Sequence, residues 1–161
     1  MEVGKLGLGS LRPILEEAGV KASLDAGEVG DLLAAVNPAI GVPDEALGFF
    51  AFHYSASNVA VAFGIPRYAL LDLVAPPGFP LDKLKLIVST FARECRSYGV
   101  EIAGGHTGRY EGVEYPLASA TVIGRRVRER RAPVEGDRVY LVGRVGTEAA
   151  WLVGYLVQLE E

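Results

Sequence analysis

The most regular pattern in the chain is a helical repeat of apolar residues between positions 81 and 98. Five apolar side chains follow helical spacing and therefore share one face: Leu84, Ile87, Val88, Phe91 and Cys95. Lysine and arginine residues occupy the opposite face, and a glycine follows directly at position 99. The pattern predicts an amphipathic helix over residues 81–98 that buries its apolar face.

Three further helices are predicted from end signals and apolar spacing. Ser10 can cap a short helix over residues 11–18. Asp44 can cap a long helix that contains no charged residue after position 45 and ends just before Gly64. A last amphipathic helix is expected over residues 147–157.

Short apolar and β-branched runs between these helices predict five strands, over residues 32–36, 67–75, 100–103, 115–124 and 138–142. A glycine-rich loop is expected at 104–108 and an arginine-rich hairpin tip at 125–131. The order of elements is β-α-β-α-β-β followed by β-α. It predicts an α+β fold of the ferredoxin-like, split βαβ type, with the helices on one face of the sheet.

Composition narrows the class of protein. The chain has 161 residues, of which 50% are hydrophobic and 22% charged, so it is long enough for one domain and too apolar for a disordered tail. Its single cysteine excludes an internal disulfide and fits a reducing cytoplasm. The net charge of −4 gives no general attraction to nucleic acid. The scarcity of asparagine and glutamine is typical of thermophile proteins.

One uncharged stretch, residues 46–66, is long enough to span a bilayer. However, it includes His53, Ser55, Ser57 and Asn58, which are costly in lipid. The start of the chain also lacks the basic and apolar regions of a signal peptide. A helix in the core of a cytoplasmic protein is therefore favoured over a membrane span.

The best candidate for chemistry is the expected loop at 104–108. Successive glycines, Gly104 and Gly105, let backbone N–H groups converge on an anion, and Thr107 adds a hydroxyl donor. His106 can contact phosphate or act as an acid or base near neutral pH. The competing interpretation is a plain turn with an exposed histidine.

Four other features carry weaker hypotheses. The small polar residues 55–58 can admit a ligand or simply pack against another element. Asp25 can hold Mg²⁺ or can be a solvated loop carboxylate. Five arginines between positions 125 and 131 can bind phosphate-rich partners, although an exposed hairpin is favoured. Cys95 falls on an apolar helix face, which favours packing over nucleophilic chemistry.

Four short motifs follow one another along the chain: Ser57-Asn58-Val59-Ala60-Val61, Gly64-Ile65-Pro66, Gly104-Gly105-His106-Thr107 and Gly136-Asp137. In this order they resemble motifs of the aminoimidazole ribonucleotide synthetase superfamily, which includes selenophosphate synthetase, thiamine-monophosphate kinase and a hydrogenase-maturation dehydratase. The histidine in the third motif and the opening Gly4-Lys5-Leu6 are closest to the hydrogenase-maturation branch.

The resemblance implies a function and a set of site residues. It implies phosphoryl transfer from ATP to an amide or acyl oxygen, with Mg²⁺ and ATP held at the interface of a homodimer whose sheets join into a barrel. The implied nucleotide-binding residues are Lys5, Asp25, Asn37, Asn58, Gly104, Gly105, His106 and Thr107. Asp25 is also the implied metal ligand. The implied division is an N-terminal domain over residues 1–145 and the start of a second domain at 146–161.

Two departures from the family pattern change this expectation. Asn37 and Val59 stand where the family has aspartates, and neither can replace a carboxylate on Mg²⁺. Full members are also about twice as long, so the chain is expected to be a fragment, one half of a split protein or a pseudo-enzyme. The two hypotheses are an ATP-binding domain with weakened Mg²⁺–ATP binding, working with a separate C-terminal half, and a non-catalytic assembly module that retains the dimer.

Overall fold

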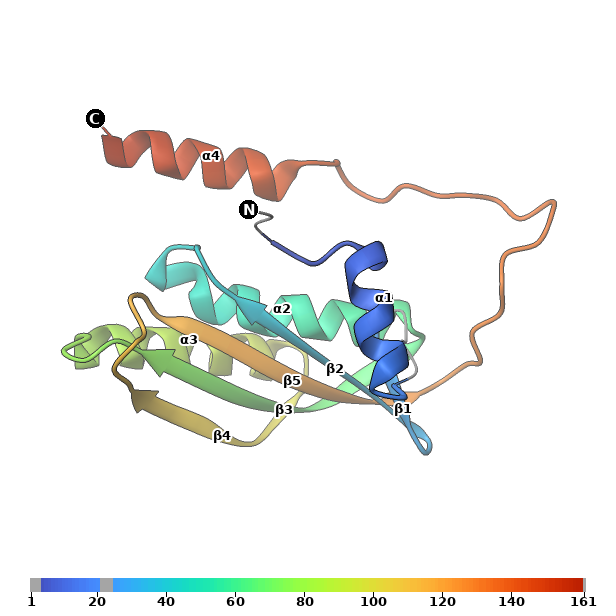
Figure 1. Cartoon of the computed structure of the whole chain (residues 1–161), viewed down its shortest axis with the longest axis horizontal. Helices are drawn as coiled ribbons and strands as arrows, with labels where there is room; N and C mark the ends of the chain where they lie inside the picture. Colours follow the sequence, from blue (N-terminus) through green and yellow to red (C-terminus); the bar gives the residue numbers. More distant parts are fainter. Residues whose placement is uncertain (1–3, 21–24, 161) are drawn as a thin grey trace. The chain divides into compact units, whose positions relative to one another are not determined.

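The computed structural model describes residues 4–20 and 25–160, with side chains described up to residue 158. Their helices and strands follow in this order: α1 (Leu8–Glu17), β1 (Gly27–Val29), β2 (Leu32–Ala39), α2 (Asp44–Val61), β3 (Gly64–Ala75), α3 (Leu81–Ser97), β4 (Glu101–Arg109), β5 (Leu117–Arg126) and α4 (Thr147–Glu160). The described elements are therefore four helices and five strands, and the predicted α+β class is confirmed (Figure 1).

The five strands form one mixed, open sheet in the order β1-β2-β5-β3-β4. β5 runs antiparallel to both of its neighbours, whereas β3 and β4 are parallel. β2 and β3 therefore run in the same direction, with β5 between them, and α2 connects them. The second crossover, through α3, carries the chain from β3 to the edge strand β4.

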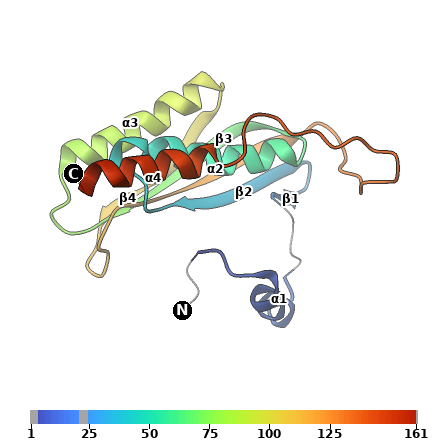
Figure 2. The ribbon, with the colours of Figure 1, turned by 90° about the horizontal axis from the view of Figure 1, so that it is seen from above.

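Both crossover helices cover the same face of the sheet. α2 packs against β2, β5 and β3, and α3 packs against α2 and β4 (Figures 1 and 2). Right-handed crossovers that advance in one direction place their helices on one face. Alternate residues of β5 follow this arrangement, because Ala118, Ala120 and Val122 are fully buried while their neighbours are half-exposed.

The contact between α2 and α3 depends on a glycine. A Cβ atom at Gly48 would overlap the backbone carbonyl oxygen of Ile87 and lie 2.7 Å from the backbone nitrogen of Phe91. The two helix backbones therefore approach more closely than any side chain at position 48 would allow. Around this contact the largest buried side chains, Phe52 and Phe91, meet edge to face at 6.2 Å between ring centroids.

The helix predictions are confirmed with shifts at their ends. α3 matches residues 81–98, and α2 begins at Asp44 but ends at Val61, before Gly64. Neither proposed cap forms, because Ser10 lies inside α1 and Pro43 precedes α2. The carboxylate of Asp44 instead accepts a hydrogen bond of 2.6 Å from Lys83 on α3, which raises the pKa of that lysine.

Three predictions on loops and strands are wrong. Residues 104–108 are part of β4, residues 125–131 do not form a hairpin, and residues 138–142 form no strand. Two arginines at the end of β5 and just after it make local contacts. Arg126 pairs with Glu28 at 3.1 Å, and the guanidinium of Arg128 lies 4.0 Å from the centre of the Phe63 ring. These two arginines therefore contact residues at this end of the sheet.

The chain divides into two compact units, Met1–Glu129 and Arg130–Glu161. Within the second unit, a turn closes between Val134 and Asp137, as the Gly136-Asp137 motif indicates. The carboxylate of Asp137 accepts hydrogen bonds from the Arg131 guanidinium, at 2.6 and 2.7 Å, and these bonds lower its pKa. α4 follows, and no helix among residues 4–20 and 25–160 is long and apolar enough to cross a membrane.

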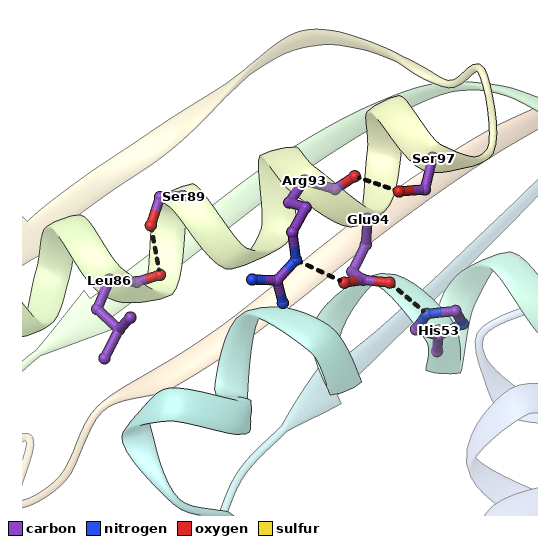
Figure 3. A network of polar contacts seen from close by, with 6 residues as sticks. All are labelled: His53, Leu86, Ser89, Arg93, Glu94 and Ser97. Atoms are coloured by element: carbon purple, nitrogen blue, oxygen red, sulfur yellow. Dashed lines mark hydrogen bonds and ion pairs between the residues drawn. The ribbon is translucent and has the colours of Figure 1, made fainter.

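Replacing Ser55 with alanine should destabilise the first unit by about 1–2 kcal/mol. Its hydroxyl is fully buried and donates a hydrogen bond of 2.6 Å to the backbone carbonyl of Ala120, so α2 is tied directly to β5. Urea denaturation followed by circular dichroism measures the change. Ser89→Ala is the matched control, because the Ser89 hydroxyl is exposed and bonds only within its own helix, to the carbonyl of Leu86 (Figure 3). Equal urea midpoints for Ser55→Ala and Ser89→Ala would contradict a stabilising role for the hydrogen bond from Ser55 to Ala120.

Candidate functional site

A pocket of about 730 Å³ lies where the end of β2 meets the C-terminal half of α2. The described residues that line it are Gly4, Lys5, Asn37, Pro38, Ile40, Tyr54, Ser57 and Asn58. Three residues implied by the family resemblance are among them, namely Lys5, Asn37 and Asn58. The volume is in the range of small-molecule sites.

The position of Asn37 is held by a hydrogen bond to α2. Its amide nitrogen donates to the backbone carbonyl of Tyr54 at 3.3 Å, and the hydroxyl of Ser57 donates to the same carbonyl at 3.2 Å. The pocket wall is therefore built around one shared acceptor, the Tyr54 carbonyl. A carboxylate at position 37 could not donate this bond and would face the carbonyl oxygen instead.

The charge of the pocket comes from Lys5. Among the described lining residues, Lys5 is the one charged side chain, and the remaining polar groups are amides and hydroxyls. Such groups can bind an anion by charge-assisted and neutral hydrogen bonds. They do not fit Mg²⁺, which prefers carboxylate oxygens, and no cluster of three potential metal-ligating side chains occurs in the part of the chain that the structure describes.

The implied metal ligand, Asp25, does not line this pocket. It lies just before β1, at the edge of the sheet, with an exposed side chain and a backbone φ of 68°. The residues immediately before it, 21–24, lie outside the described structure. The structure therefore does not bring Asp25 together with Asn37 and Asn58.

The glycine-rich motif lies in the strand at the opposite edge of the sheet from β1 and β2. Gly104, Gly105, His106 and Thr107 belong to the edge strand β4, which is separated from β2 by β5 and β3. With strands about 4.8 Å apart, β2 and β4 are about 14 Å apart within one chain. An extended strand points successive N–H groups in opposite directions, so this segment forms no loop that gathers them on one anion.

The two polar side chains of the motif face opposite ways. His106 is paired in register with Asp72, and its Nε2 atom lies 2.6 Å from the hydroxyl oxygen of Tyr110. Thr107 is paired with the fully buried Leu73 and lines a groove of about 590 Å³ beside α3. Within this chain they therefore belong to different surfaces.

His53 belongs to the contact between the helices rather than to the pocket. Its Nε2 atom lies 3.2 Å from a carboxylate oxygen of Glu94 on α3, and the other oxygen of Glu94 accepts a bond of 3.2 Å from Arg93 (Figure 3). The imidazole also packs against Phe49, at 4.2 Å between ring centroids. These contacts support a structural role for His53 at the α2–α3 interface.

Val59, which stands at a position of a family aspartate, points into the core. It is fully buried, and its Cγ1 atom lies against the positions where Gly64 and Gly124 lack side chains. Its neighbour Asn58 lines the pocket, because successive residues of a helix point about 100° apart. A side chain at position 59 therefore does not reach the pocket.

Sequence reasoning missed the backbone part of this site. The Tyr54 carbonyl, which orients both Asn37 and Ser57, has no side-chain signature. Pro38 and Ile40, which also line the pocket, were not distinguishable from the rest of an apolar strand end. The side-chain signals that coincide with the pocket are the motif at residues 57–58 and the Asn37-Pro38 pair.

Replacing Asn37 with aspartate should lower the stability of the fold by about 1–3 kcal/mol at neutral pH, because the donor to Tyr54 is lost and an anion faces a carbonyl. The pKa of the new carboxyl is expected to rise on folding, so the lost stability returns as pH falls and a protonated carboxyl can donate. Thermal denaturation across a pH series measures this. Asn58→Asp, in the same pocket, should shift stability by less than about 0.5 kcal/mol. A pH-independent loss for Asn37→Asp would contradict the prediction.

Comparison with known proteins identifies the family. The model of "AIR synthase related protein, N-terminal domain" matches residues 21–126. Thiamine-monophosphate kinase of Aquifex aeolicus (strain VF5) is 29% identical over 119 residues, 73% of this chain and 38% of that protein. Carbamoyl dehydratase HypE of Escherichia coli (strain K12) is 32% identical over 104 residues, 59% of this chain and 31% of that protein.

Solved structures show the same fold. AaThiL complexed with AMPPCP and TMP superposes with a TM-score of 0.76 at 22% identity, over 100% of this chain and 57% of that chain. Hydrogenase maturation protein HypE in complex with ATP gives a TM-score of 0.54 at 22% identity, over 72% of this chain and 36% of that chain. The chain spans about a third of the length of the curated relatives named above. Because the family model covers more than half of the sequence, the chain belongs to the AIR synthase related family and matches its N-terminal domain.

Proposed function

We propose that this chain is a nucleotide-binding domain of an ATP-dependent enzyme of the synthetase or kinase type. The observation that carries the proposal is the pocket at the end of β2, where Lys5, Asn37 and Asn58 meet. A structure of the related HypE holds ATP, which supports ATP as the ligand. The reaction proposed for the complete protein is phosphoryl transfer to an amide or acyl oxygen.

The proposed assembly is a homodimer through the uncovered face of the sheet, with the paired sheets forming a barrel. On that face β2 exposes Leu32 and Val36 and β3 exposes Tyr68, although exposed apolar side chains usually avoid such clustering. A dimer would also offer the β4 motif a route to a nucleotide site that it lacks within one chain. A separate C-terminal half is the second proposed partner.

Calorimetric titration of the full 161-residue chain with ATP, in the presence of magnesium, tests the proposed ligand. Measurable heat at micromolar to millimolar ATP is expected, and its loss in Asn58→Ala would place the ligand in the pocket. Absence of heat at millimolar ATP, both with magnesium and without it, would overturn nucleotide binding by this chain.

The second candidate is an assembly module without catalysis. It is favoured by one observation, the lack of any carboxylate among the described residues of the pocket. Light scattering tests the feature that the two candidates share, since both require a dimer. A dimer that binds no ATP supports the assembly module, whereas a monomer contradicts both.

A further inference from the structure

We propose that the pocket between β2 and α2 binds the phosphate groups of its nucleotide directly, through the Lys5 ammonium and the Asn58 side-chain amide, without a divalent cation. This inference rests on the proposed nucleotide-binding function. It concerns how the charge of the ligand is neutralised, which the family assignment leaves open for this chain.

The first support is the donor set of the pocket. Lys5 supplies an ammonium group and Asn58 an amide, and none of the described lining residues supplies a carboxylate. Magnesium is usually held by one or two protein carboxylates in addition to phosphate oxygens. An ammonium group at the same pocket also repels a second cation, so Lys5 and Mg²⁺ would compete for the same phosphate charge.

The second support is that packing disfavours carboxylates at positions 37 and 59. The amide of Asn37 is committed as a donor to the Tyr54 carbonyl, so an acid at position 37 conflicts with the contact between β2 and α2. Position 59 faces the core beneath two glycines, at zero exposure. A carboxylate at position 37 therefore costs a hydrogen bond to α2, and a carboxylate at position 59 would not reach the pocket.

The third support is electrostatic. Because the other described lining residues are neutral, the pocket carries the charge of Lys5 alone. A charge-assisted hydrogen bond from an ammonium to phosphate is stronger than a neutral one, and neutral amides add directional donors around it. This combination favours a free polyphosphate anion over its magnesium complex, which has lost two units of negative charge.

Two parallel calorimetric titrations of the full chain with ATP test the inference, one with magnesium and one with EDTA, at equal ionic strength. We expect Kd in EDTA to equal that in magnesium within about threefold, or to be lower. Lys5→Met should weaken binding at least about tenfold in both conditions. Lys5 is exposed, so this variant should fold as the parent does.

Lys85→Met is the matched control, because Lys85 is a cation on α3 that lines the separate groove beside β4. It should leave Kd unchanged within about twofold. Binding that requires magnesium would overturn the inference and leave the proposed function intact. Equal losses from Lys5→Met and Lys85→Met would also overturn it, and no binding in either titration would overturn the proposed function itself.

Discussion

Replacing Val59 with aspartate should destabilise the first unit by about 4 kcal/mol or more at neutral pH, enough to unfold a marginal domain. Val59 has zero exposure, and its Cγ1 atom fills the space left by Gly64 and Gly124. A carboxylate there would lose its hydration and gain no cation, because the surrounding core is apolar. Urea denaturation at neutral pH, followed by circular dichroism, measures the loss.

The loss should depend on pH in a defined direction. Burial without a partner raises the pKa of the new carboxyl on folding, so the folded state tolerates the neutral acid better than the anion. Stability is therefore partly recovered at acidic pH and lost as pH rises through the raised pKa. Val59→Thr distinguishes the effect of charge from that of side-chain shape, because threonine is β-branched like valine but does not ionise. It should lower the free energy of unfolding by about 1–2 kcal/mol with no pH dependence.

Val61→Asp provides the matched control at the same end of α2. Val61 is 55% exposed, so its replacement should change stability by less than about 1 kcal/mol. If Val59→Asp were as stable as Val61→Asp and bound magnesium, the side chain would have to face the pocket. Position 59 would then belong to the metal site that the family pattern implies. The same result would contradict nucleotide binding without magnesium.

The sequence-based predictions succeeded for segments in which apolar residues repeat with a regular spacing. α3 was predictable because its apolar residues repeat with helical spacing over a long segment, and Phe91 and Cys95 are indeed fully buried. The segment at 104–108 has no such repeat, since four of its residues are glycine or threonine. Its strand conformation comes from pairing with β3, a tertiary contact that local composition does not encode.

The candidate site was predictable only where a motif coincided with a pocket. The resemblance drew attention to Asn58 and Val59 together, but adjacent helix residues point to different sides, and just one of them lines the pocket. Asn37 was aligned with a metal ligand, whereas its amide acts as a donor to a backbone carbonyl. A pattern of residue types cannot reveal that role, because the acceptor is a main-chain atom on another element.

The second large effect is expected at Gly105. Its replacement with alanine should destabilise the fold by about 2–4 kcal/mol, because a Cβ atom there would overlap the carbonyl oxygen of Leu71 and lie 2.9 Å from its nitrogen. The backbone φ of 156° adds a further cost for any residue with a side chain. β4 would have to move away from β3, and hydrogen exchange should show faster exchange of the β4 amides than of those in β5.

Gly104 is the matched control for this strand. It precedes Gly105 directly and shares its place in the glycine-rich motif, yet a Cβ atom there meets nothing within 4 Å. Gly104→Ala should therefore change stability by less than about 0.5 kcal/mol. The pair separates two explanations of the motif, since a phosphate-binding role would make both glycines matter for ligand affinity without a loss of stability. A stable Gly105→Ala variant would show that β4 does not approach β3 as closely as the structure indicates. It would support the loop conformation that the sequence predicts for residues 104–108.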